Sequence, residues 1–257
     1  RLESFITNQV NSIHNFDLCE DGELEQSVKE EIVSKDASEN VKTMFTFAIS
    51  EGSLLICRKS SSPIDQVINL DEFNKVKRVK IELDRYDSLL PDWDDHTFLS
   101  KVLLQLNHYT SLIVVFAPFG LNDHHALKLL DILFCRTQYL TGIEVSIEKC
   151  EITDGPIMFF CNQILPKATS LKYLTLKLGY TLFSDASLFA LTKSLCLLNE
   201  NLKSFTLRAE STQITDDGIE KILYAIEEVK ALRLYLEKTG ITDRSLKVLG
   251  NNMMLGM

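Results

Sequence analysis

Apolar and polar residues alternate in short segments along the chain after residue 76, and a helical pattern follows each segment. An apolar residue at every second position predicts a strand with one buried face, and the residues between lie on the opposite face. A partial copy, with Val79, Ile81 and Leu83, precedes five clearer ones. The apolar positions of the five are Leu112, Val114 and Phe116; Ile143, Val145 and Ile147; Leu174, Leu176 and Leu178; Phe205, Leu207 and Ala209; and Leu232, Leu234 and Leu236.

An aspartate marks the start of the helical pattern after each strand. The aspartates lie at positions 123, 154, 185, 216 and 243. The first three spacings between consecutive aspartates are identical, and the last one is shorter. After Asp216, apolar residues at 219, 222, 223, 226 and 229 have the spacing of a buried helix face. We expect a helix to begin within two residues of each aspartate, whose side chain caps it by accepting a bond from a first-turn N–H group.

Equal steps indicate stacked copies of one strand–turn–helix unit. Such a unit cannot bury its own apolar face, so the copies pack side by side. The predicted fold is therefore α/β, with a parallel sheet and a second layer of helices. The segments expected to be neighbouring strands are 112–116, 143–147, 174–178, 205–209 and 232–236.

A motif between strand and helix carries a family resemblance. It reads L-x-L, then an Asn/Cys/Thr position, then I-x-D-x-G, although Phe119 departs from it and the glycine occurs only as Gly218. The Asn/Cys/Thr position holds Cys150, Thr181, Thr212 and Thr239. The motif resembles the leucine-rich repeat family, in its ribonuclease-inhibitor-like class. The resemblance implies a horseshoe-shaped solenoid with the parallel sheet on its concave side and helices on its convex side.

The N-terminal region, residues 1–75, differs from the repeats. It is predicted to hold amphipathic helices at 1–16 and 24–33 and a β-hairpin over 41–57, which turns at Glu51 and Gly52. A repeat stack needs a cover over its end, so we expect the hairpin to be a cap; the acidic helix as a separate docking element is the alternative. Residues 76–257 then form the repeat domain, with about six repeats and an incomplete last one.

Charge and composition narrow the classes of partner. The formal charge is −9, of which residues 1–75 supply most, with 14 acidic against 7 basic residues. No basic stripe is visible, which disfavours nucleic-acid binding. No apolar run approaches the length that a membrane-spanning helix needs, so no membrane insertion is expected. The six scattered cysteines without a CxxC motif are typical of a reducing, intracellular compartment, either the cytoplasm or a cytoskeleton- or organelle-associated assembly.

Motifs for catalysis or metal binding are not found in the sequence. There is no glycine-rich phosphate loop, G-x-S-x-G or HExxH. His124 and His125 are adjacent, and neighbouring helical residues do not share a face, which is poor metal geometry. The expectation is a protein that is not an enzyme, with no cofactor, no metal and no small-molecule substrate.

The candidate binding residues are those between the buried strand positions, on the concave face of the predicted horseshoe. Tyrosine and arginine, which are enriched at interface cores, lie among them, and Arg208, Arg233 and Tyr235 are expected to form one patch. Contacts through the helices or the ends of the stack are the alternative. The predicted partner-binding residues are Glu144, Ser146, Glu148, Thr175, Lys177, Thr206, Arg208, Glu210, Arg233, Tyr235 and Glu237.

The leading hypothesis is a non-catalytic protein–protein interaction module, a structural subunit or scaffold of a larger assembly. Two alternatives stay open. The first is a regulator of a small GTPase, since Ran GTPase-activating proteins resemble this repeat class. The second is the ligand-sensing repeat domain of a longer protein.

Overall fold

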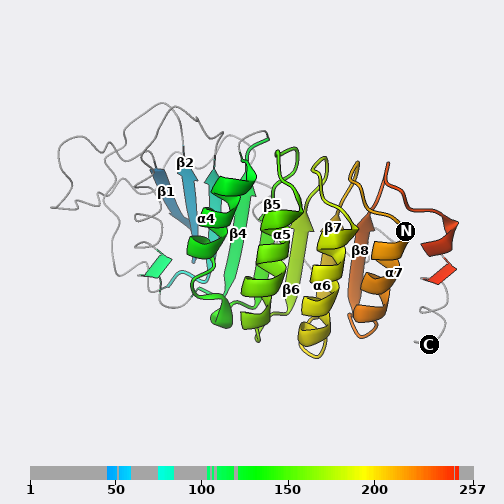
Figure 1. The fold of residues 1–257 in the computed structure, drawn as a ribbon. Coiled ribbons are helices and arrows are strands. Elements are labelled where there is room, and N and C mark those ends of the chain that lie inside the picture. Colours follow the sequence, from blue (N-terminus) through cyan, green and yellow to red (C-terminus); the bar gives the residue numbers. More distant parts are fainter. Residues whose placement is uncertain are drawn as a thin grey trace, which may run out of the picture.

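The computed structural model shows two layers, a sheet and a row of helices packed on it (Figure 1). It describes residues 45–50, 52–58, 75–83, 109–118, 121–245 and 247–248, together with residues 103, 104 and 106. The predicted N-terminal helices at 1–16 and 24–33 lie outside these described residues.

The eight described strands form one sheet in chain order. β1 is antiparallel to β2, and every later neighbour pair is parallel. The strands are β1 (Phe45–Ser50), β2 (Ser53–Arg58), β3 (Arg78–Leu83), β4 (Ser111–Phe116), β5 (Gly142–Ser146), β6 (Tyr173–Lys177), β7 (Ser204–Arg208) and β8 (Ala231–Tyr235). The predicted α/β fold, with parallel strands in sequence order, is confirmed.

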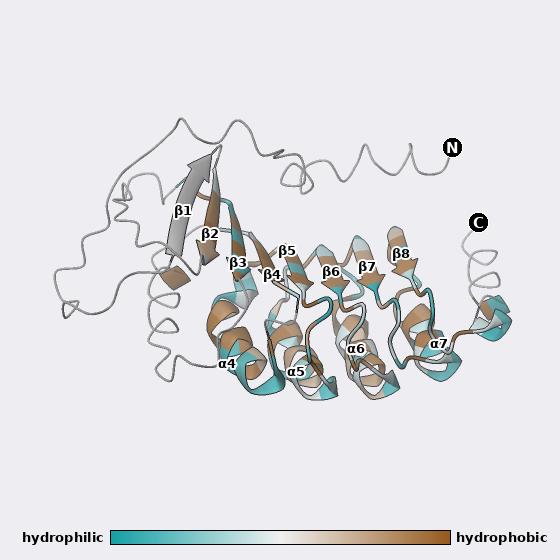
Figure 2. Ribbon diagram, turned by 90° about the horizontal axis from the view of Figure 1, so that it is seen from above, coloured by the Kyte–Doolittle hydropathy of each residue, from teal (hydrophilic) through white to brown (hydrophobic). Residues whose placement is uncertain are grey.

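Helices alternate with the strands, and those with described bounds lie on one side of the sheet (Figure 2). Each α-helix with described bounds begins at a predicted aspartate. The α-helices are α4 (Asp123–Leu133), α5 (Asp154–Phe159), α6 (Asp185–Leu198) and α7 (Asp216–Ala225). Shorter elements are the 3-10 helices η2 (Thr137–Tyr139) and η4 (Leu165–Lys167) and the π-helix η3 (Phe160–Ile164), which continues α5.

The alternating pattern determines which strand residues face the helices. In β7, Phe205 and Leu207 are fully buried, whereas Thr206 and Arg208 are half-buried. The strands β4 to β8 begin one residue earlier than the apolar pattern predicted. The reason is that the residue before the first apolar position already joins the ladder, as Ser204 N does by donating to Lys172 O at 3.0 Å.

The prediction that the recurring aspartate caps its own helix is wrong. The residue before it is the cap: Thr153 and Thr215, for example, have extended backbones, and their hydroxyls accept from the N–H groups of Gly155 and Asp217. The aspartate occupies the first helical position instead. Ser, Thr and Asn are all good caps, so the sequence alone could not assign the role between two adjacent polar residues.

The aspartate carboxylate instead bonds to the next repeat. Asp185 accepts from Thr215 N at 2.9 Å and from Thr215 Oγ1 at 2.6 Å. Asp216 accepts in the same way from Thr242, at 3.0 Å and 2.6 Å. Asp123 and Asp154 make the equivalent bonds to the caps Thr153 and Ser184. We call these four carboxylates and their partners the aspartate ladder; it fastens each helix start to the repeat before it.

The turn between strand and helix is also hydrogen-bonded. The hydroxyls of Thr181, Thr212 and Thr239 each donate to the carbonyl three residues earlier, at 2.7 Å. Threonine therefore closes this turn at the Asn/Cys/Thr position of the motif. A residue with positive φ lies directly before that position in four repeats, namely Lys149, Tyr180, Ser211 and Lys238.

The predicted hairpin is confirmed as β1 and β2, and it shares the sheet with the repeats. At its turn, Gly52 has φ of +76°, a left-handed conformation that favours glycine. The carbonyl of Gly52 accepts from Lys77 N at 2.7 Å, which attaches the hairpin to the start of β3. The role of this hairpin as a cap remains a prediction.

Candidate functional site

The sheet face turned away from α4–α7 carries the predicted binding residues, and we call it the polar face. All of them alternate with core residues in β5 to β8 or continue those strands. Their exposure differs widely. Ser146 and Glu210 are only 6% and 8% exposed, whereas Tyr235 is 44% exposed. Ser146 and Glu210 therefore offer little surface for direct contact with a partner, while Tyr235 offers a broad one.

Strand register determines which residues of the polar face are neighbours. Glu144 lies beside Thr175, and Lys177 beside Arg208. Lys177 Nζ nevertheless forms an ion pair with Glu144 Oε1, at 2.8 Å, although Glu144 is not its register neighbour on β5. This ion pair joins β5 to β6 and neutralises both charges.

Arg208 is the centre of a second charge cluster. Its Nη2 lies 2.9 Å from Glu210 Oε1, and its Nε lies 3.7 Å from Glu148 Oε1. Its guanidinium carbon is 5.2 Å from the centre of the Tyr235 ring, a cation–π distance. Partial burial alone would lower the pKa of Arg208, but its hydrogen bonds to Glu210 and the nearby carboxylates outweigh burial and raise it.

The predicted patch of Arg208, Arg233 and Tyr235 is arranged as the strand register requires. Tyr235 lies beside Arg208, and Arg233 lies beside Thr206, further back along the same two strands. Arg208 is held by glutamates of its own chain, so it also stabilises the face. Sequence reasoning missed the ion pair with Glu148, because that residue lies two repeats before Arg208 in the chain.

Aromatic residues that sequence reasoning missed also lie near this face. Tyr173, at the start of β6, is 37% exposed and lies between Gly142 and Ser204 on the neighbouring strands. Tyr180 follows β6 and is 51% exposed, with Lys149 Nζ 5.6 Å from its ring centre. Gly142 and Ser204 are small and leave the Tyr173 ring partly exposed. Their small size was the sequence signal that could have identified this residue.

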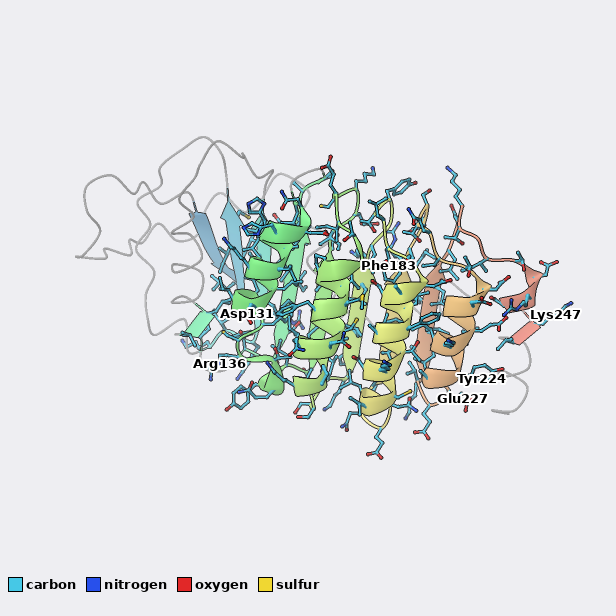
Figure 3. The ribbon with its side chains drawn as sticks, in the orientation of Figure 1. Asp131, Arg136, Phe183, Tyr224, Glu227 and Lys247 are labelled. Carbon is cyan, nitrogen blue, oxygen red and sulfur yellow. The ribbon has the colours of Figure 1, made fainter. Side chains whose placement is uncertain are left out.

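The helix layer also carries exposed apolar side chains. Figure 3 shows Tyr224 and Glu227 at one end of α7, and Tyr224 is 57% exposed. Other exposed apolar residues, such as Leu197 in α6 and Tyr139 in η2, come from different repeats. Single exposed apolar residues are normal on protein surfaces.

Among the described residues, no group of three or more His, Cys, Asp or Glu side chains is placed to hold a metal ion. A narrow hollow beneath α4 and α5 is lined by apolar side chains, among them Phe116, Leu130 and Phe160. None of the helices described has both the length and the apolar composition needed to cross a bilayer.

Neither a scan against protein-family models nor a search of curated proteins found a match for this chain. The polar face therefore has to be interpreted from its own geometry: a row of parallel strands with paired charges, an arginine stacked on a tyrosine, and exposed aromatic rings.

Proposed function

We propose that the chain is a leucine-rich repeat protein of the ribonuclease-inhibitor-like class, and that it acts as a non-catalytic protein-interaction module. Alternating strands and helices, equally spaced helix starts (at 123, 154, 185 and 216) and threonine-closed turns all support the family. In such a solenoid, the polar face is the concave side of a horseshoe. The role is that of a structural subunit or scaffold in a larger assembly.

The observation that carries this proposal is the Arg208–Tyr235 stack on the polar face. Arginine and tyrosine dominate the energetic centres of protein interfaces, because each combines a large apolar surface with hydrogen-bonding groups. Here the guanidinium carbon and the ring centre are 5.2 Å apart, and Glu210 and Glu148 hold the arginine in place. A rigid anchor loses little side-chain entropy when a partner binds.

An intracellular location is part of the proposal. Cys161 is a fully buried thiol, and burial raises its pKa to about 12. A thiol with so high a pKa is uncharged and unreactive at neutral pH, as expected of a core residue in a reducing compartment.

Site-specific photo-crosslinking in cells tests the proposed binding face. A photoreactive amino acid replaces Thr206 on the polar face in one variant and Tyr224 on α7 in a matched control. We expect Thr206 to give a discrete crosslinked protein that disappears when Tyr235→Ala is added. Crosslinks from Tyr224 alone would place the partner on the helices and overturn the proposal.

A further inference from the structure

Three glutamates and one glycine form a row across the polar face, at the ends of β5 to β8. Backbone bonds fix their alignment: Lys149 N donates to Gly179 O at 2.9 Å, Tyr180 N to Glu210 O at 2.7 Å, and Ser211 N to Glu237 O at 2.8 Å. The row consists of Glu148, Gly179, Glu210 and Glu237, and we call it the glutamate row.

Two of its carboxylates lean into the space above Gly179. A Cβ atom at position 179 would lie 2.9 Å from Glu210 Oε2 and 3.6 Å from Glu148 Oε1. Any other residue would therefore push the Glu210 carboxylate away. Glycine here creates a small gap, and the gap is lined by acidic oxygens from the strands on either side.

One of those oxygens lacks a partner. Glu210 is only 8% exposed, and its Oε2 is buried with no hydrogen-bond partner, although Oε1 accepts from Arg208. A buried acceptor without a donor is costly, and a charged one more so. The Glu210 carboxylate is thus only half satisfied by the protein itself.

The carboxylates paired with Arg208 outnumber it. Arg208 contributes one positive charge against Glu148 and Glu210, and Glu237 at the end of the row is exposed. Of the other cations near this face, Lys177 is paired with Glu144 further down the strands, and Lys149 lies near the Tyr180 ring. One more positive charge would balance Glu148, Arg208 and Glu210.

Aromatic rings border this position. Tyr235 and Tyr180 are 44% and 51% exposed, and each already has a cation near its ring, Arg208 and Lys149 respectively. Rings in such positions stabilise a cation and also pack against the aliphatic stem of a lysine or arginine.

We propose that the glutamate row is the subsite that receives a lysine or arginine side chain of the protein partner. The incoming cation donates to Glu148 and to the free oxygen of Glu210 above Gly179, and its stem packs on Tyr235. The buried oxygen becomes accessible when the Glu210 carboxylate turns outward, while its Oε1 keeps its bond to Arg208. This assignment rests on the proposed function, since it names the chemistry recognised on the same face.

Nuclear magnetic resonance titration with the peptide tetralysine, and with tetraglutamate as its counterpart, tests the assignment on the whole chain. We expect tetralysine to shift the amide signals of Gly179 and Tyr180 and the Nε signal of Arg208, whereas tetraglutamate leaves them unchanged. The double variant Glu148→Gln/Glu237→Gln should weaken tetralysine binding by about threefold to tenfold, because it removes the partly exposed ion pair with Glu148 and a second negative charge of the row.

Glu227→Gln is the matched control, because it removes the same charge from an exposed glutamate at the end of α7, outside the polar face. It should bind tetralysine as the wild type does. Equal binding by the double variant, or shifts at Glu144 and none at Gly179, would overturn the assignment. Photo-crosslinking from Thr206 that persists unchanged in the double variant would leave the interaction face standing and remove only this subsite.

Discussion

Gly218 shows how closely consecutive repeats fit at the level of single residues. A Cβ atom at this position would lie 2.3 Å from Asp185 Oδ1 and 2.7 Å from Leu188 Cδ1. Asp185 cannot move freely, because it accepts two hydrogen bonds from Thr215. The glycine of the repeat motif is therefore required by the aspartate of the preceding repeat.

We expect Gly218→Ala to destabilise the protein by about 1–3 kcal/mol, since the added methyl group must displace a bonded carboxylate or a core leucine. Gly155→Ala is the control, because its nearest atoms would be 3.8 Å away, at ordinary contact distance. Urea denaturation of both variants measures the difference. Equal unfolding midpoints would show that Asp185 rearranges without cost.

Arg208 is the second residue whose replacement tests the structure. Arg208→Ala leaves Glu210 buried without its cation, so we expect a loss of about 1–3 kcal/mol in the free energy of unfolding. A residue that only contacted a partner would leave the thermal midpoint nearly unchanged. Thermal denaturation distinguishes the two, and Arg208→Ala/Glu210→Gln should recover part of the loss, because the uncompensated charge is gone.

At the scale of elements, the aspartate ladder makes helix α7 and the following helix start sensitive to acid. Hydrogen bonds from Ser245 and Thr242 hold the pKa of Asp216 well below its ordinary value. A depressed folded-state pKa stabilises the fold at pH values above the unfolded-state pKa, which is about 3.9 for aspartate. The stabilisation is lost as the pH falls toward the folded-state pKa.

Asp216→Asn should therefore differ from the wild type most at neutral pH, and the difference should shrink as the pH falls below about 4. Urea midpoints measured from neutral to acidic pH follow this convergence. If the urea midpoints of the two proteins differed by the same amount at every pH, the negative charge of Asp216 would contribute nothing to stability.

The strands and helices could be predicted from the sequence, whereas the side-chain contacts between repeats could not. Alternation and the constant step between aspartates predicted the parallel order of β4 to β8 and the helix starts at Asp123, Asp154, Asp185 and Asp216. The role of these aspartates could not be predicted, because their partners lie in another repeat and come into contact only after stacking. The ion pair between Arg208 and Glu148 was hidden for the same reason.

At the scale of the whole molecule, burial is uneven along the stack. Leu207 in β7 is fully buried, whereas Leu234, its neighbour in β8, is only partly buried although it packs against the same core. Stability in repeat proteins is approximately a sum over repeats and their interfaces. The region around β8 therefore contributes less than the repeats in the middle.

We expect Leu207→Ala to cost about 2–5 kcal/mol and Leu234→Ala clearly less, because a partly exposed side chain leaves a smaller cavity. Hydrogen exchange should show the same gradient, with amides of β8 exchanging faster than those of β6. Equal costs for the two leucines would indicate that β8 is covered in solution.

The aspartate ladder also has a direction. Each carboxylate belongs to one repeat, and the hydroxyl and N–H groups it accepts from belong to the repeat that follows in the chain. A ribosome makes the chain in that order, so each emerging helix start meets an acceptor that has already been synthesised. The bonding pattern thus suits vectorial growth of the stack during translation, one repeat serving as the template for the next.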